Sequence, residues 1–213
     1  MNFLSPELDK YVAEHTEPES ETLQKLNRET NAKVLYPQML AGHLQGRMLS
    51  MLCHMIQPKQ ILEIGTYTGY SAICLAEGLQ EGGTFHTIDI NEELEEMVKS
   101  YFVEAGISDK VRFYIGNALE IIPTIDKTFD LVFIDADKEN YINYYNMVFD
   151  KVRTGGYIIA DNVLWNSKVL QDAKKMDAET RAINAFNKKI QADLRVHNVL
   201  FPIRDGLMLI RKS

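Results

Sequence analysis

Residues 60–71 of the chain read QILEIGTYTGYS. The first part is a short apolar run, typical of a buried strand, that ends at Gly65. A second glycine, Gly69, precedes residues 70–79, whose apolar spacing predicts a helix. The stretch therefore predicts a strand, a tight turn and a helix, in that order.

The same unit repeats toward the C-terminus. Further strands are predicted at residues 84–89, 111–115, 129–135 and 157–161, helices at 92–105, 119–122, 141–152 and 177–193, and a turn at Gly155-Gly156. Strands that alternate with helices form a parallel sheet covered by helices on both faces. Residues 196–201 and 207–210 predict a final antiparallel pair. The expected fold class is α/β, with a mostly parallel twisted sheet and an antiparallel last strand.

The first 56 residues precede this repeat and carry helical signals. Thr16-Glu17-Pro18-Glu19 matches a capping box and predicts the start of a helix that runs through Leu23 and Leu26. Apolar residues recur at helical spacing over residues 39–56. We expect a single domain, 1–213, with a helical preamble at 1–56 and a sheet core at 57–213.

Composition excludes several classes of protein. With 46% hydrophobic and 25% charged residues, this 213-residue chain matches globular domains rather than disordered or fibrous proteins. A formal net charge of −7 is unsuited to nucleic acid or an anionic membrane. Neither a signal peptide nor an apolar run of membrane-spanning length occurs, and Cys53 and Cys74 lie in apolar stretches typical of inert buried thiols. We expect a cytoplasmic protein with a small-molecule partner.

Ligands of open parallel sheets bind beyond the carboxyl ends of the strands, and here those ends are acidic. The turn from Glu63 to Gly69 lets a ligand approach the backbone closely, although glycine is also common in ordinary turns. The dinucleotide pattern Gly-x-Gly-x-x-Gly is absent, and Glu63 would repel a pyrophosphate. Asp89, 24 residues after Gly65, is close to the ~20-residue offset of a ribose-binding carboxylate, with a solvated acid as the alternative. Ribose recognition without a pyrophosphate site suggests S-adenosylmethionine (SAM).

A second group of polar residues follows two other predicted strands. Asp135, Asp161 and Asn162 offer hard oxygen donors suited to Mg²⁺, with Mn²⁺ or Ca²⁺ as alternatives. A purely structural role as helix caps is the other interpretation. No cluster of histidine and cysteine points to zinc. Lys138, three residues after Asp135, is placed to take a proton from a phenol or to stabilise the phenolate, unless it is a surface lysine.

Three motifs, LEIGTYTGYS at 62–71, FIDADKENY at 133–141 and DNVLW at 161–165, agree in order and spacing with one family. The chain resembles the cation-dependent O-methyltransferases of the caffeoyl-CoA and catechol type, from about residue 40 to residue 211. The resemblance implies a seven-stranded Rossmann-like fold of the SAM-dependent methyltransferases, a homodimer, and methyl transfer from SAM to one hydroxyl of a small phenolic substrate with vicinal hydroxyls.

The resemblance also implies roles for individual residues. Asp135, Asp161 and Asn162 match metal ligands, Lys138 matches the general base, and Trp165 matches a wall of the acceptor site. The expected cofactor contacts are Met39, Ala41, Glu63, Gly65, Tyr70, Ser71, Asp89, Asn117, Ala118 and Asp135. At Pro202 the chain departs from the catechol enzyme, which has an acid there, so the acceptor stays open.

Two other functions compete with this interpretation. A nicotinamide-dependent oxidoreductase would use a similar sheet, but the third glycine is missing and Glu63 is unfavourable. A non-catalytic SAM-binding protein would not need the set formed by Asp135, Lys138, Asp161 and Asn162.

Overall fold

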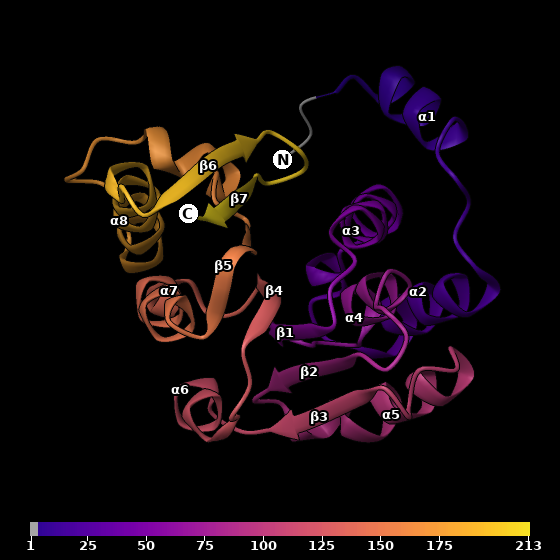
Figure 1. The fold of residues 1–213 in the computed structure, drawn as a ribbon. Coiled ribbons are helices and arrows are strands. Elements are labelled where there is room, and N and C mark those ends of the chain that lie inside the picture. Colours follow the sequence, from indigo (N-terminus) through magenta and orange to yellow (C-terminus); the bar gives the residue numbers. More distant parts are fainter. Residues whose placement is uncertain (1–3) are drawn as a thin grey trace. The chain divides into compact units, whose positions relative to one another are not determined.

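The computed structural model describes residues 4–213 (Figure 1), so the first three residues of the predicted preamble lie outside it. The described chain forms two compact units, residues 4–118 and 119–213. The strand order is β3-β2-β1-β4-β5-β7-β6. The predicted α/β class is confirmed, with seven strands that are mostly parallel and an antiparallel last strand, β7 (Leu207–Lys212). Organisation as a single domain with a preamble ending at residue 56 stays a prediction.

The unit of residues 4–118 contains three parallel strands and five α-helices. Its elements are α1 (Pro6–Glu14), α2 (Glu21–Lys33), η1 (Pro37–Met39), α3 (His43–Ile56), β1 (Gln60–Ile64), α4 (Tyr70–Ala76), β2 (Thr84–Asp89), η2 (Glu92–Leu94), α5 (Glu95–Glu104) and β3 (Val111–Ile115). Strand β2 lies between β1 and β3, with Glu63 opposite Thr87 and Asp89 opposite Ile115. The carboxyl ends of the three strands therefore lie side by side.

The start of α2 differs from the prediction. Ser20 caps this helix by accepting a hydrogen bond from the Leu23 N–H at 3.3 Å, whereas the Thr16 hydroxyl donates to the Val12 carbonyl behind it. Pro18 explains the difference, because a residue that precedes proline is disfavoured in the helical conformation. The predicted capping box at Thr16 is therefore wrong, and α1 is a separate helix that ends before it.

The unit of residues 119–213 contains the other four strands. Its elements are α6 (Ala118–Ile121, which begins at the preceding residue), η3 (Ile122–Thr124), β4 (Phe129–Ile134), η4 (Lys138–Asn140), α7 (Tyr141–Phe149), β5 (Val152–Asp161), η5 (Trp165–Leu170), α8 (Ala178–Ala192), β6 (Val196–Phe201) and β7. Strands β4 and β5 are parallel, and β7 pairs antiparallel with β5 and β6. Residues 131–134 of β4 are fully buried, as expected for a strand covered on both faces.

Strand β5 is longer than predicted. The preceding helix α7 ends at Phe149 rather than residue 152, and the strand runs through Gly155-Gly156, where the sequence predicted a turn. The register between β4 and β5 shifts in this region, and Gly155 has a φ of 75°. Glycine here therefore accommodates an irregularity inside the strand rather than a break before it.

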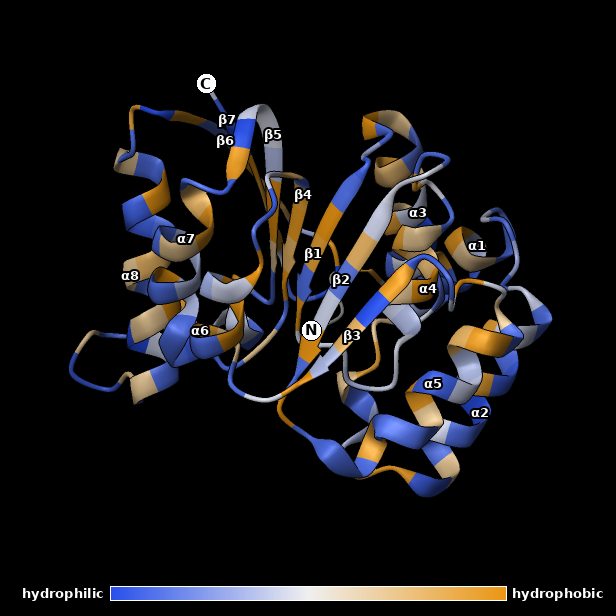
Figure 2. Ribbon diagram, turned by 60° about the horizontal axis from the view of Figure 1, so that its bottom comes forward, coloured by the Kyte–Doolittle hydropathy of each residue, from blue (hydrophilic) through white to orange (hydrophobic). Residues whose placement is uncertain are grey.

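The distribution of hydrophobic residues differs between the helices of the unit of residues 4–118 (Figure 2). Every residue of α4 is buried, whereas α2 buries Leu23, Leu26 and Thr30 and otherwise carries polar side chains. Helix α4 is thus the inner helix of its unit, and it begins immediately after the turn that follows β1. Within residues 4–213, no helix combines the length and apolarity needed to cross a bilayer.

Candidate functional site

A buried carboxylate on β1 anchors the turn between β1 and α4. Glu63 is fully buried, and its two oxygens accept hydrogen bonds from Ser71 Oγ at 2.6 Å and Thr87 Oγ1 at 2.5 Å. The Thr66 hydroxyl lies 2.5 Å from Thr87 Oγ1. A buried carboxylate requires such partners, because an unpaired buried charge is costly. Glu63, expected as a cofactor contact, therefore ties the turn to β2.

The backbone of this turn has a conformation that favours glycine. Gly65 and Gly69 have φ values of 100° and 90°, and Tyr67 between them has a φ of 49°. A Cβ atom on Gly69 would lie 2.9 Å from Phe102 Cε1, so a side chain there would collide with α5. The glycines expected from the sequence to bring a backbone close to a ligand are thus required by the turn itself.

Asp89 lies beside the same turn. Its Oδ2 accepts a hydrogen bond from the Tyr67 N–H at 2.6 Å, and its Oδ1 accepts one from the Asn91 N–H at 2.9 Å. The two bonds hold the carboxylate in one orientation at the end of β2. The structure thus brings together Asp89 and the glycine turn, as the ribose-binding hypothesis requires.

The remaining predicted cofactor residues of this unit lie on two flanking segments. Asn117 and Ala118 follow β3, where the Gly116 N–H donates to the Asp89 carbonyl at 2.8 Å. Met39 is exposed and Ala41 is buried. Their segment is tied to the turn because Tyr67 Oη donates to the carbonyl oxygens of residues 35 and 36, at 3.1 and 3.2 Å. The Tyr70 hydroxyl, in contrast, is bonded to Glu19.

In the unit of residues 119–213, the second group of predicted residues also converges. Ile134 of β4 pairs with Ala160 of β5, so the residues that follow them, Asp135 and Asp161, occupy neighbouring strand ends. Lys138 is buried, and its Nζ donates to Asp135 Oδ1 at 3.0 Å. Two of the residues that the sequence singled out for chemistry, Lys138 and Asp135, are therefore in direct contact.

Tyr141 joins these groups, and the sequence interpretation gave it no role. Lys138 Nζ donates to Tyr141 Oη at 2.6 Å, and Tyr141 Oη donates to the backbone carbonyl of Asp161 at 2.9 Å. Burial raises the pKa of Tyr141 well above its ordinary value, with further contributions from the charges of Asp135, Asp161 and Asp137. The spacing of three between Lys138 and Tyr141 was the available signal, because such residues share a helix face.

The loop after β5 has an unusual backbone. Asn162, Trp165, Asn166 and Ser167 all have φ values between 47° and 60°. Each such non-glycine residue costs on the order of 1–3 kcal/mol, and such residues concentrate at ligand sites. Asp205 holds the loop: its carbonyl accepts the Leu164 N–H at 2.8 Å, and its Oδ1 accepts the Asn166 N–H at 2.6 Å.

Two lysine side chains lie close to the ring of Trp165. Lys138 Nζ is 5.7 Å and Lys168 Nζ is 5.8 Å from the centroid of its ring. Both separations fall within the range of cation–π attraction. The indole Nε1 is buried without a hydrogen-bond partner among the described residues. The ring of Trp165 therefore lies next to the buried Lys138, and its role as the wall of an acceptor site stays a prediction.

The residues at the ends of β4 and β5 fit a hard divalent cation. Asp135 is partly exposed, and Asp161 Oδ1 accepts the Asn162 N–H at 2.7 Å, which fixes the orientation of that carboxylate. The carboxylates of residues 135, 137 and 161 all contribute to the raised pKa of Tyr141, so several negative charges lie near this hydroxyl. Within the described part of the chain no group of three or more His, Cys, Asp or Glu side chains is arranged to hold a metal, and the ligand roles expected for Asp135, Asp161 and Asn162 stay predictions.

Comparisons with known proteins agree with this geometry. A family model described as O-methyltransferase matches residues 13–213. Caffeoyl-CoA O-methyltransferase of Petroselinum crispum is 37% identical over 208 residues, which cover 91% of this chain and 85% of that protein. Caffeoyl-CoA O-methyltransferase 2 of Zea mays is 38% identical over 223 residues, covering 98% and 83%.

Solved structures give the same result. The O-methyltransferase TomG from Streptomyces achromogenes, in complex with SAM, has a TM-score of 0.90 at 29% identity and covers 97% of this chain and 96% of its own. The O-methyltransferase from Bacillus cereus, in complex with S-adenosylhomocysteine (SAH), has a TM-score of 0.90 at 30% identity, covering 97% of each chain.

Proposed function

Since this chain belongs to the O-methyltransferase family, we propose that it methylates one hydroxyl of a small phenolic acceptor with two adjacent hydroxyls, with the help of a divalent cation. SAM-dependent O-methyl transfer follows from the family itself. The cation and the catechol-like acceptor are the parts that we propose. The observation that carries them is the convergence of Asp135, Asp161 and Lys138 at the ends of two paired strands.

Asp135, Asp161 and Asn162 would hold the cation, with Mg²⁺ as the first candidate and Mn²⁺ or Ca²⁺ as alternatives. When bound, such a cation favours ionisation of a catechol hydroxyl and holds its oxygen in place. Two adjacent hydroxyls suit this role, because together they can replace two water molecules of an octahedral shell.

The side chains around the cation site have separate tasks. Lys138 Nζ, in its amine form, would take the proton of the reacting hydroxyl, and Asp135 and Tyr141 fix the position of that nitrogen. Trp165 would stack against the aromatic ring of the acceptor. The acceptor oxygen then bonds to the methyl carbon as the bond between that carbon and the sulfur of SAM breaks, which leaves SAH as the second product.

In the other unit, Glu63, Gly65, Tyr70, Ser71 and Asp89 are proposed to form the donor site. Met39, Ala41, Asn117 and Ala118 would complete it, and Asp135 is proposed as a further contact of the cofactor. Support comes from the ordered Asp89 carboxylate next to the glycine turn, which suits the two hydroxyls of a ribose.

Membership of the family removes the two competing functions. A nicotinamide-dependent oxidoreductase does not belong to a family of O-methyltransferases, and the relatives that this chain matches are enzymes rather than proteins that only bind SAM. A homodimer in the cytoplasm remains our proposal. The exposed apolar side chains of Val199 and Phe201 on β6 are available for a contact between subunits, and light scattering together with cell fractionation would test both points.

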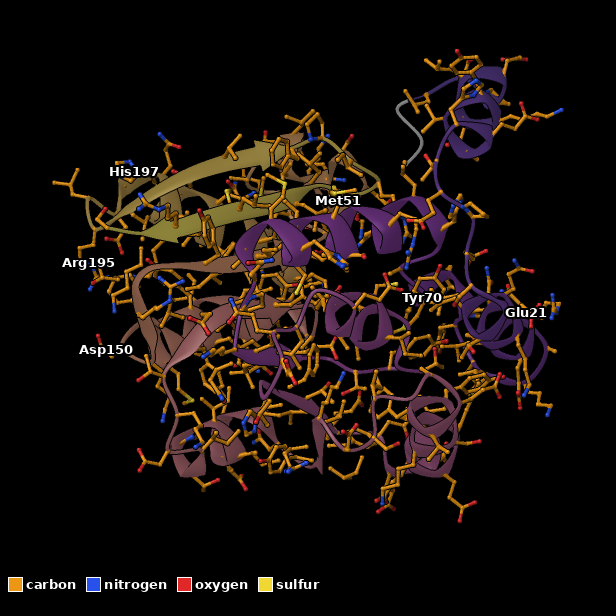
Figure 3. All side chains as sticks on the ribbon, turned by 45° about the vertical axis from the view of Figure 1, so that its right-hand side comes forward. Glu21, Met51, Tyr70, Asp150, Arg195 and His197 are labelled. Atoms are coloured by element: carbon orange, nitrogen blue, oxygen red, sulfur yellow. The ribbon has the colours of Figure 1, made fainter. Side chains whose placement is uncertain are left out.

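The decisive experiment separates metal binding from methyl transfer. In Asp161→Ala, Mn²⁺ affinity measured by calorimetry should fall at least about 10-fold, since even outer-shell changes cost 10–100-fold. Methylation of a catechol probe should be lost, and SAH should still bind. The matched control is Asp150→Ala, which removes an exposed carboxylate of the same unit (Figure 3). Unchanged Mn²⁺ affinity in Asp161→Ala, or full wild-type turnover in the presence of a chelator, would refute the proposed cation.

A further inference from the structure

We propose that Glu19 is a positioning residue for the donor site. Its carboxylate fixes Tyr70, so that residues 17–36 help to hold the turn that follows β1 in its binding conformation. The proposal rests on the assignment of that turn to SAM. It adds a residue outside all three motifs that carried the family resemblance.

The central contact joins Tyr70 to Glu19. Tyr70 is the first residue of α4 and is 2% exposed, and its Oη donates to Glu19 Oε1 at 2.5 Å. Burial raises the pKa of Tyr70, and the hydrogen bond to Glu19 raises it further. The phenol therefore stays protonated and donates to an anionic acceptor, which is the stronger class of hydrogen bond. The Asn27 amide approaches the same Glu19 oxygen at 3.5 Å and helps to orient it.

The fold makes room for this contact. Gly46 is the fourth residue of α3, inside the helix, where glycine is less favourable than alanine. A Cβ atom at this position would lie 2.6 Å from Tyr70 Cε1 and 3.4 Å from Tyr70 Oη. Gly46 thus leaves the space through which the phenol ring reaches Glu19.

The residues beside Tyr70 contact the same N-terminal part of the chain. The Thr68 hydroxyl lies 3.2 Å from the hydroxyl of Thr30 on α2, and Tyr67 Oη donates to the backbone carbonyls of residues 35 and 36. The hydroxyls of Thr66 and Ser71 instead bond to side chains of the sheet, Thr87 on β2 and Glu63 on β1. The turn is therefore held from both sides, by the sheet and by residues 17–36.

The segment that carries Glu19 is itself fixed at Glu17. Arg47 Nη1 lies 3.7 Å from Glu17 Oε2, while Arg47 Nη2 donates to Glu77 Oε1 at 2.7 Å. The ring of His43 lies 2.6 Å from the Glu17 carbonyl oxygen. Helices α3 and α4 thus hold the short segment between α1 and α2 so that Glu19 meets Tyr70. Without the carboxylate of Glu19, the buried phenol loses its partner at the point where the turn enters α4.

The test compares Glu19→Ala, Glu19→Gln, Tyr70→Phe and the double variant Glu19→Ala with Tyr70→Phe. SAH affinity is measured by calorimetry, with Mn²⁺ affinity and thermal unfolding recorded on the same samples. Glu19→Ala and Tyr70→Phe should each raise the Kd of SAH about 10-fold, the factor expected when one hydrogen bond to a charged group is lost. Glu19→Gln, whose amide oxygen still accepts, should stay within about 2-fold of wild type. The double variant should be no weaker than either single one, because both remove one interaction.

The control is Glu21→Ala on the first turn of α2, where Glu21 is exposed and lies two residues from Glu19 (Figure 3). This variant should bind SAH like wild type. A Kd in Glu19→Ala equal to that of wild type, or additive effects in the double variant, would overturn the proposal. A loss of thermal stability in Glu19→Ala with unchanged SAH affinity would show a structural role only and would also reject it. If Glu19→Ala fails to fold, Tyr70→Phe and Glu19→Gln decide by the same criteria. Failure of wild type to bind SAH would instead refute the donor-site assignment.

Discussion

Lys138 Nζ lies 3.0 Å from Asp135 Oδ1. Asp135 directly follows strand β4, whereas Lys138 begins the 3-10 helix η4. The pair is largely withdrawn from solvent, since the Lys138 side chain is 7% and the Asp135 side chain 24% exposed. Burial of a lysine that could otherwise extend into water indicates that its position is functionally constrained.

Replacement of Lys138 should affect the chemical step and leave donor binding intact. In Lys138→Met, turnover of a catechol probe should fall about 10²–10⁴-fold, the usual contribution of a positioned acid or base. The Kd of SAH should remain within about 2-fold. Initial rates and calorimetry measure the two quantities, with the exposed Lys188→Met as the control. A loss of less than about 3-fold in turnover would rule out the proposed proton transfer.

Removal of the Tyr141 hydroxyl should destabilise the unit of residues 119–213. Tyr141→Phe keeps the ring but removes two buried hydrogen bonds, the one that the hydroxyl donates to the Asp161 carbonyl and the one that it accepts from Lys138. The free energy of unfolding should fall by about 1–3 kcal/mol, the range for the loss of such buried hydrogen bonds. Urea denaturation measures the difference, and Tyr157→Phe is the control. Equal stability of Tyr141→Phe and wild type would contradict the role given to this hydroxyl.

The two cysteines should be unreactive in the folded protein. Burial raises the pKa of Cys53 and of Cys74 to about 12, so at pH 8 both are protonated thiols without access to solvent. A colorimetric disulfide reagent should titrate neither thiol in the native protein and both in 6 M guanidinium, the concentration of a standard denaturing control. Rapid reaction of one thiol under native conditions would show that its helix opens locally.

The carboxylate of Asp193 should make the thermal stability of the protein depend on pH in the acid range. Hydrogen bonds from Arg195, together with one from Tyr145, hold the pKa of this carboxylate below its ordinary value. A lowered pKa in the folded state contributes stability above the unfolded pKa of about 3.9, and this contribution disappears as the pH falls through the folded value. Asp193→Asn should therefore melt below wild type at pH 7, with the difference shrinking below about pH 4. The control is Asp126→Asn, which removes an exposed carboxylate of the same unit. A melting difference between Asp193→Asn and wild type that does not shrink below about pH 4 would contradict this role of Asp193.

Several features of the fold could be predicted from local patterns. The carboxyl ends of parallel strands meet at one edge, so Asp135 and Asp161 were expected to be neighbours from their places after two apolar runs. The glycines at 65 and 69 were correctly placed in a turn because they end one periodic segment and begin another. The start of α2 was predicted wrongly, because the capping pattern at Thr16 was read without the restriction that Pro18 places on the preceding residue.

The contacts that the sequence did not reveal join residues far apart in the chain. Tyr70 and Glu19 are 51 residues apart, and no spacing rule relates them. The roles of Tyr141 and Asp205 also depend on tertiary structure, since Tyr141 contacts the backbone at the end of β5 and Asp205 contacts the backbone of the loop that follows β5. Local periodicity places a residue on an element, but the partner that it meets there depends on packing.

The left-handed backbone at residues 165–167 restricts any attempt to change acceptor preference by directed evolution. Valine or isoleucine at these positions would have to adopt a conformation that branched side chains strongly disfavour, whereas glycine and asparagine would be tolerated. Libraries that randomise the loop fully would therefore contain many destabilised clones. Codons limited to glycine, asparagine and aspartate at 166 and 167, with Trp165 kept and full diversity at 168–171, would retain folded variants while still reshaping the rim.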